Sequence, residues 1–195
     1  MANFKTRAVS KEEFELIIKT ISTGFVLPDG RRVKPNERVA TCLILEAQLG
    51  LRIGDIVHLR LKDIVLENGK YRLNYFEEQK TRKTRHFLVP NEVYIFLQDY
   101  AIRHNLKPTQ LLFDISVRTV QNHLQLSCQY LGITGVSTHS FRKFFAQKIF
   151  EDNNFDILLI KELMQHSSVA ITQRYLGVSS QRAEQALKNH IVIPT

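Results

Sequence analysis

The sequence predicts an α+β fold that is mainly α-helical and carries a small three-stranded antiparallel sheet. Apolar residues recur at helical spacing along most of the chain, which is typical of amphipathic helices. The sheet is predicted by Asn68-Gly69, a strong hairpin-turn signal between two short segments of strand-forming residues. A chain of 195 residues can bury one sizeable core, so we expect one main domain.

Capping signals predict where the helices begin and end. Ser10 and Glu13 form a capping box in front of an apolar run, and Ser116 is placed to cap a later helix. Gly50 and Gly132 each stop a helix, because glycine readily takes the left-handed conformation that ends one. The predicted helices span residues 10–21, 38–49, 56–60, 91–104, 116–131, 138–151, 156–165, 168–176 and 179–190. The predicted strands span residues 63–67, 70–77 and 85–90, and a loop spans residues 24–37.

The composition favours a polyanionic partner. Lys and Arg number 27 against 19 Asp and Glu, which gives a net charge of +8. Cations are concentrated in the predicted loop over 31–38 and in the turn over 80–85. The alternative is an ordinary solvated cationic surface.

The cysteines and the N-terminus bear on the compartment. Cys42 and Cys128 lie far apart in apolar surroundings, which predicts buried thiols in a reducing compartment. No stretch resembles a signal peptide or a membrane span, so we expect a cytoplasmic protein without a membrane partner. No group of residues has the spacing of a metal site, and we expect neither a metal nor another cofactor.

Three residues could together bind a phosphate. His139 and Arg142 are three apart in a predicted helix, and Ser137 or Thr138 can cap that helix so that its first turn also favours an anion. A planar guanidinium suits two phosphate oxygens. Arg52 follows a helix stop and could neutralise the same charge. The alternative is a set of surface residues that pair with acids elsewhere.

Three further residues could carry out a reaction. Lys80 opens the cationic turn and could donate a proton, although a solvated lysine is the plainer reading. His166 ends a predicted helix, where a capping role is the alternative. Tyr175 lies nine residues later and could act as a nucleophile, whereas most tyrosines there pack against the domain.

The order of these residues resembles the tyrosine recombinase (phage integrase) family over about residues 10–180. RIGD after a glycine-stopped helix, a lysine in a β-turn, HxxR, and a histidine nine residues before a tyrosine all occur in the family's order. The resemblance implies that family's catalytic-domain fold. It also implies two phosphate-binding arginines, a general-acid lysine, two histidines at the phosphate and a tyrosine nucleophile, at Arg52, Arg142, Lys80, His139, His166 and Tyr175.

The resemblance implies a site-specific DNA recombinase. Its tyrosine would attack a DNA phosphodiester to give a 3′-phosphotyrosyl link and a free 5′-hydroxyl, without ATP or metal. The alternatives are a non-cleaving DNA-binding regulator of the same fold and a type IB topoisomerase-like enzyme. Three positions depart from the family pattern: Gln165 replaces a usual glycine, Asp55 a common glutamate and Phe141 a common leucine.

The resemblance also predicts partners and an organisation. Double-stranded DNA is the expected partner, with a weakly self-associating chain that forms a tetramer on DNA and with accessory DNA-bending proteins as candidates. We expect an N-terminal arm over 1–9, the catalytic domain over 10–178, and a helix and tail over 179–195 that could be exchanged between subunits. The residues expected to contact DNA are Arg31, Arg32, Lys34, Arg38, Arg82, Lys83, Arg85 and Lys143.

Most members carry a further N-terminal DNA-binding domain, whereas the catalytic pattern here begins near Ser10. The sequence is therefore expected to be either an excised catalytic fragment or a short recombinase similar to the fimbrial-switch invertases.

Overall fold

The computed structural model describes residues 6–77 and 84–176. The chain divides into two compact units, residues 1–145 and residues 146–195, and the boundary falls inside helix α6 (Thr138–Asp152). The helix and tail expected over 179–195 lie outside the described residues. The domain limits expected from the sequence therefore stay a prediction.

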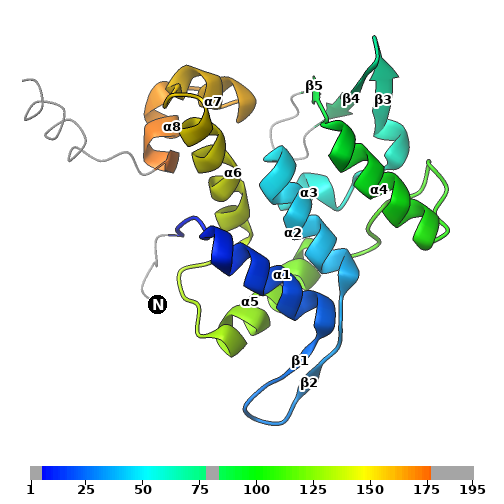
Figure 1. Ribbon diagram of the computed structural model, residues 1–195, viewed down its shortest axis with the longest axis vertical. Helices are drawn as coiled ribbons and strands as arrows, with labels where there is room; N and C mark the ends of the chain where they lie inside the picture. The colour runs from blue at the N-terminus through cyan, green and yellow to red at the C-terminus, as the bar shows by residue number, and fades with distance from the viewer. Residues whose placement is uncertain (1–5, 78–83, 177–195) are drawn as a thin grey trace, which may run out of the picture. The chain divides into compact units, whose positions relative to one another are not determined.

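The first unit is built around three packed helices. α1 (Lys11–Thr23), α2 (Glu37–Leu49) and α5 (Val117–Leu131) pack on one another, as Figure 1 shows. α2 is the most buried of them, because apolar residues occupy almost every side of it. The core that they enclose includes Ile17, Ile21, Val39, Leu43, Leu45, Val120 and Leu124. The capping box of Ser10 and Glu13 is confirmed, as are the left-handed stops at Gly50 and Gly132.

A three-stranded antiparallel sheet forms as predicted, in the order β3 (Ile64–Glu67), β4 (Lys70–Glu77) and β5 (Thr84–Leu88). Asn68 and Gly69 both have positive φ angles, 50° and 74°, which gives the predicted hairpin turn. α4 (Asn91–Arg103) packs on β4, and its Tyr94 stacks on Tyr71 with ring centroids 3.6 Å apart. The cationic turn expected over 80–85 falls largely outside the described residues, at 80–83.

Two local predictions are wrong. The loop expected over 24–37 contains a hairpin of β1 (Phe25–Val26) and β2 (Arg32–Val33), too short to leave a periodic signal. The short helix expected over 56–60 instead lies earlier, at α3 (Ile53–Ile56). It begins there because the Arg52 carbonyl accepts the backbone N–H groups of Asp55 and Ile56 at 2.9 and 3.0 Å. A single 3₁₀ turn (Leu61–Asp63) then leads into β3.

Aromatic packing holds the first two turns of α6 on the first unit. Phe141 is fully buried and meets Phe14 of α1 edge to face, with centroids 6.0 Å apart. Phe144 stacks on the same Phe14 ring at 5.6 Å. These contacts fix the position of the first two turns of α6 along the helix axis and their rotation about it. They therefore also fix the side chains of the first turn.

Part of the expected N-terminal arm is tied to the first unit. Arg7 donates to both carboxylate oxygens of Glu13, and its backbone N–H donates to the carbonyl of Gly135 at 3.1 Å. Lys143 donates to the carbonyl of Thr6 at 2.5 Å. Residues 6–9 of the expected arm therefore pack on the first unit.

The second unit contains the rest of α6, α7 (Ile157–Leu163) and α8 (Val169–Leu176). Asp156 caps α7 by accepting the backbone N–H groups of Leu158 and Leu159. α7 and α8 pack on each other, and Gln147 donates to the carbonyl of Leu176 at 3.3 Å. These contacts hold α8, and therefore the tyrosine within it, against the rest of the second unit.

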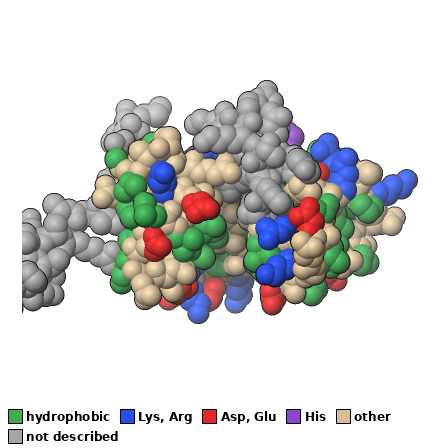
Figure 2. All heavy atoms as spheres, turned by 90° about the horizontal axis from the view of Figure 1, so that it is seen from above, with side chains coloured by type: hydrophobic (Ala, Val, Ile, Leu, Met, Phe, Trp, Pro, Cys, Tyr) green, Lys and Arg blue, Asp and Glu red, His purple; other side chains and the backbone are tan. Residues whose placement is uncertain are grey.

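On the face in Figure 2, Lys and Arg side chains are interspersed with Asp and Glu side chains and with apolar surface. No helix of the described ranges combines the length and the apolar character that crossing a membrane requires. Cys42 and Cys128 are both buried free thiols, as predicted.

Gly50→Ala should destabilise the first unit more than glycine replacement usually does. Gly50 has φ 57°, and a Cβ there would lie 2.4 Å from Cδ1 of Phe145. We expect the free energy of unfolding to fall by about 2–4 kcal/mol, measured by urea denaturation. Gly132→Ala is the matched control, since it has φ 69° with nothing within 4 Å of the added carbon. An equal loss in both variants would show that the Phe145 contact has no cost.

Candidate active site

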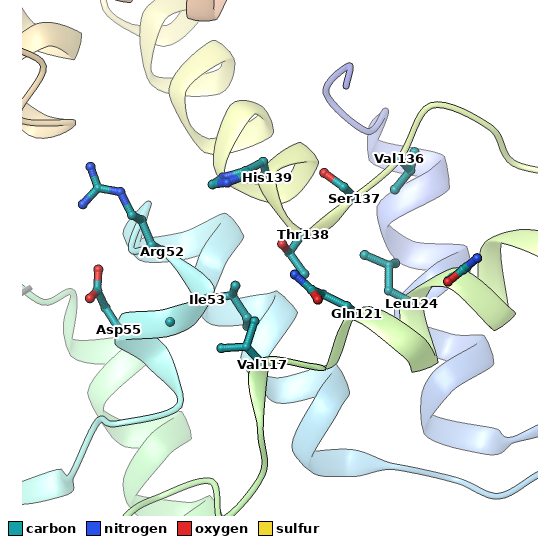
Figure 3. Close-up of a pocket in the computed structure, with 12 residues that line it drawn as sticks. Arg52, Ile53, Asp55, Val117, Gln121, Leu124, Val136, Ser137, Thr138 and His139 are labelled. Carbon is teal, nitrogen blue, oxygen red and sulfur yellow. The ribbon is translucent and has the colours of Figure 1, made fainter. Parts of the chain in front are cut away.

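A cavity of about 650 Å³ in the first unit gathers two of the predicted site residues. Arg52 and His139 line it, together with the buried carboxyl-bearing residue Asp55. Figure 3 shows His139 pointing from α6 toward the side of the cavity where Arg52 and Asp55 lie. Ser137 and Gln121 also line the cavity, so a cation, an imidazole and neutral hydrogen-bonding groups face one space.

The backbone around Arg52 explains why its side chain is held at the cavity. Gly50 ends α2 in the left-handed conformation, and the chain turns at once into α3. Arg52 occupies the N-cap position of α3 in an extended conformation, φ −77° and ψ 148°. The turn between α2 and α3 thus directs the half-buried Arg52 side chain outward from the two helices.

His139 lies in the first turn of α6 and is exposed. The start of this helix is fixed by Ser137 and Ser140, whose backbone and side chain exchange hydrogen bonds of 2.9 and 3.0 Å. Backbone N–H groups at a helix start favour an anion. The cavity therefore combines a helix N-terminus, an imidazole and a guanidinium, all of which suit a phosphate.

Arg142 occupies a different environment from His139, although the sequence suggested that the two share one face. Its side chain is 2% exposed, and its guanidinium donates a hydrogen bond to the carbonyl of Gly50. The C-terminal carbonyls of a helix carry partial negative charge, so this contact stabilises the cation. Arg142 therefore lies at the end of α2.

The second unit brings His166 and Tyr175 together. Their rings meet edge to face, with centroids 5.1 Å apart and planes at 66°. Nδ1 of His166 lies 3.0 Å from the hydroxyl of Thr172, a fully buried residue. That hydroxyl also donates to the Ser168 carbonyl at 3.4 Å, which favours donation by Nδ1–H to Thr172. The hydroxyl oxygen of Tyr175 is itself buried.

Gln165, the departure beside His166, has a left-handed backbone with φ 52°. The N–H of His166 donates to the Lys161 carbonyl and the N–H of Gln165 to the Glu162 carbonyl, both at 2.9 Å. These two bonds are a Schellman motif with Gln165 at the position that favours glycine. The motif fixes the backbone of His166 despite the side chain at residue 165, so the non-glycine residue costs conformational energy without disrupting the turn.

The remaining predicted residues divide into three groups. Lys80, Arg82 and Lys83 lie outside the described residues, and Arg85 lies in β5. Lys143 contacts Thr6 as described above. The loop cations are exposed at the β1–β2 hairpin and the start of α2, at Arg31, Arg32, Lys34 and Arg38.

Sequence reasoning missed three polar residues that the structure places at or near these groups. Gln121 lines the cavity, Thr172 orients His166, and Glu46 is buried in α2 near Arg142. Only Glu46 left a signal, because it is an acidic residue on a helix that is otherwise apolar on almost every side. In the described residues, no cluster of three or more His, Cys, Asp or Glu could hold a metal ion.

The groups of the first unit suit a phosphate, and the second unit holds a tyrosine beside a histidine. Residues 7–182 match the model of the phage integrase family. The chain therefore belongs to the phage integrase family, which confirms the resemblance found in its sequence.

Named relatives agree with this assignment. The chain is 30% identical to the probable integrase/recombinase YoeC of Bacillus subtilis, over 78% of this chain and 84% of that protein. It is 26% identical to the tyrosine recombinase XerC of Lactobacillus leichmannii, over 84% of this chain. The match spans 58% of that relative's length.

Solved structures show the same fold. The catalytic domain of bacteriophage HP1 integrase has a TM-score of 0.64 at 19% identity, over 95% of this chain and 96% of that domain. XerA recombinase has a TM-score of 0.64 at 20% identity, over 100% of this chain and 67% of that one. The predicted fold class is therefore confirmed.

Gln165→Gly should stabilise the turn before His166. The substitution removes a left-handed non-glycine residue, whose cost is about 1–2 kcal/mol, but adds freedom to the unfolded chain. It also removes a buried amide oxygen that has no hydrogen-bond partner among the described residues. We expect a net gain of about 0.5–1 kcal/mol, measured by hydrogen exchange of the His166 amide.

Gln165→Ala is the matched control, because it removes the amide but keeps the backbone strain. Equal protection of the His166 amide in both variants would contradict the strain argument.

Proposed function

We propose that this chain cleaves and rejoins DNA strands through a covalent 3′-phosphotyrosyl intermediate, with Tyr175 as the nucleophile. The class of enzyme, a tyrosine-type site-specific DNA recombinase, follows from its membership of the phage integrase family and from relatives named tyrosine recombinase. The observation that carries the residue assignment is the pairing of His166 with Tyr175 in one small packed unit.

The proposed reaction conserves the energy of the phosphodiester. The Tyr175 oxygen bonds to phosphorus, the bond to the 5′ oxygen breaks, and a later 5′-hydroxyl reverses the step. His139 takes the phenol proton, and Lys80 gives a proton to the leaving 5′ oxygen. The chemistry needs neither ATP nor a metal, because the ester retains the bond energy.

The first unit supplies the phosphate-binding part of this proposal. Arg52 and His139 face the same cavity, and Arg142 supplies a second guanidinium near the end of α2. Fixed cations of this kind stabilise charge that develops on a phosphate as it is attacked. For the reaction, these groups and those of the second unit must all reach one scissile phosphate in the DNA complex.

We further propose double-stranded DNA as the substrate and a tetramer on DNA as the active assembly. Structural neighbours described as bound to DNA include XerH recombinase with its difH substrate, which agrees with such a substrate. Exposed cations at the hairpin and the start of α2 would contact the backbone, so binding should weaken with salt. DNA-bending accessory proteins and a cytoplasmic location belong to the same proposal.

Tyr175→Phe should abolish covalent capture of DNA. On a nicked suicide substrate the short 5′ fragment diffuses away after cleavage, so the native protein accumulates an adduct. We expect no adduct from the variant, measured by denaturing gel electrophoresis, and undiminished adduct formation by the native protein in EDTA. His166→Asn is the companion variant and should only slow the reaction.

Tyr71→Phe is a matched control, since Tyr71 packs against Tyr94 in the sheet. An adduct that survives Tyr175→Phe would contradict the assignment of the nucleophile. A native protein that binds but cleaves no cognate site would favour a non-cleaving regulator.

Lys80→Ala should slow cleavage by about 10²–10⁴-fold, because the leaving 5′ oxygen then lacks its acid. A 5′-bridging phosphorothiolate substrate should restore the rate, since its sulfur leaves without protonation. Single-turnover rates on both substrates measure the effect, with Lys70→Ala as the control from the same sheet. Absence of rescue would remove Lys80 from the acid role.

A further inference from the structure

Glu46 is a completely buried acidic side chain that the proposed reaction does not use. It lies near the C-terminal end of α2 and is 0% exposed. Its carboxyl oxygens are buried and make no well-formed hydrogen bond among the described residues, although the Ile53 amide lies near enough to favour the carboxylate form. A buried carboxyl is normally hydrogen bonded, because burial without a partner costs free energy. Its presence therefore calls for an explanation.

Arg142 links Glu46 to the phosphate-binding groups. The guanidinium of Arg142 donates to the carbonyl of Gly50, and the N–H of Gly50 donates to the carbonyl of Glu46 at 3.1 Å. Both side chains are almost completely buried, and the positive charge of Arg142 opposes the rise in the pKa of the Glu46 carboxyl. An arginine remains a cation in proteins, so Glu46 is the member of the pair that can change charge.

The surroundings of Glu46 set the balance between its protonated and its ionised form. Burial raises the pKa of the Glu46 carboxyl well above its usual range, and the charge of Arg142 from α6 and the Ile53 amide from α3 oppose that rise. On α2 itself, the titratable neighbour is the buried thiol of Cys42. Within the described ranges, α1 and α5, which also pack on α2, add no charged group to these influences.

We propose that Glu46 is a positioning residue of the phosphate-binding site, which balances the charge of Arg142 when no anion is bound and takes up a proton when an oxyanion binds. An oxyanion bound near Arg142 disfavours the ionised form of Glu46, because two negative charges would then lie beside the same guanidinium. Conversely, a neutral Glu46 leaves the positive charge of Arg142 for the ligand. The proposal rests on the assignment of Arg142 as a phosphate-binding residue.

The coupling between oxyanion binding and protonation of Glu46 has a defined sign. Because oxyanion binding takes up a proton, the affinity falls as pH rises through the range in which Glu46 ionises, by at most about tenfold per pH unit. Folding follows the same linkage. Because the pKa of Glu46 is raised in the folded state, the contribution of Glu46 to stability is fully present below about pH 4.3, the value in an unfolded chain, and is lost as pH rises toward the folded-state pKa.

Sulfate is a suitable probe, since it is a tetrahedral dianion whose charge does not change between about pH 5 and about pH 9. The melting temperature of the whole chain is measured against sulfate concentration across this range, with chloride at matched ionic strength. We expect the native protein to lose sulfate affinity as pH rises. Glu46→Gln should bind sulfate with much less dependence on pH, and its melting temperature should exceed that of the native protein most at high pH.

Glu15→Gln is the matched control, because Glu15 is exposed on α1, and it should follow the native protein. Glu46→Leu gives a second neutral side chain of similar size if the glutamine variant does not fold. If the sulfate affinity of the Glu46 variants fell with rising pH as steeply as that of the native protein, the proposal would be overturned. The pH dependence would then belong to another group such as His139. Absence of sulfate binding at every pH would also overturn it. Both results are read from sulfate binding and do not depend on DNA cleavage. Failure of the proposed function would appear separately, as a missing covalent adduct on the suicide substrate.

Discussion

The seating of α6 on the end of α2 is the constraint on which the first unit's site depends. Arg142 bonds to the Gly50 carbonyl, while the Phe145 ring occupies the space that a side chain at residue 50 would fill. Three requirements meet at Gly50: a left-handed turn, a close ring contact and an acceptor for a buried cation. Because α3 begins three residues later, with Arg52 as its N-cap, the same contacts also fix Arg52. A substituted residue 50 would therefore displace both arginines.

The second unit depends on a turn of a different kind. A Schellman motif sets the backbone of His166, and Thr172 then sets the orientation of its ring. The fixed ring lies against Tyr175, so the geometry of the histidine and tyrosine is determined within one short segment. This arrangement tolerates Gln165 at a glycine position because the two backbone hydrogen bonds do not need a particular side chain.

Local signals predicted most of the fold. Ser10, Gly50, Asn68-Gly69 and Gly132 each act on neighbouring residues, and the structure places a cap, a stop or a turn at every one. The β1–β2 hairpin was missed because strands of two residues cannot show alternation. Helix α3 was misplaced because its start depends on the Arg52 carbonyl, a backbone interaction that side-chain patterns do not reveal.

The candidate site was predictable in its residue types but not in its environments. The order of arginines, histidines and tyrosine identified the family. The spacing of His139 and Arg142, however, suggested that the two side chains share one environment on the same helix face. The difference between them, one exposed and one buried, arises from α2, which is distant in sequence. Glu46 belongs to the same tertiary environment, and so its relation to Arg142 could not be derived from sequence.

The burial of both thiols makes the chain a convenient carrier for spectroscopic labels. Cys42 and Cys128 are the two cysteines of the sequence, and burial raises the pKa of the Cys128 thiol to about 11 and that of Cys42 further still. Thiols that stay protonated and enclosed react slowly with maleimides. A single cysteine added on an exposed helix face would therefore carry a fluorophore selectively, without replacement of the native residues, and could report distances within a DNA-bound assembly.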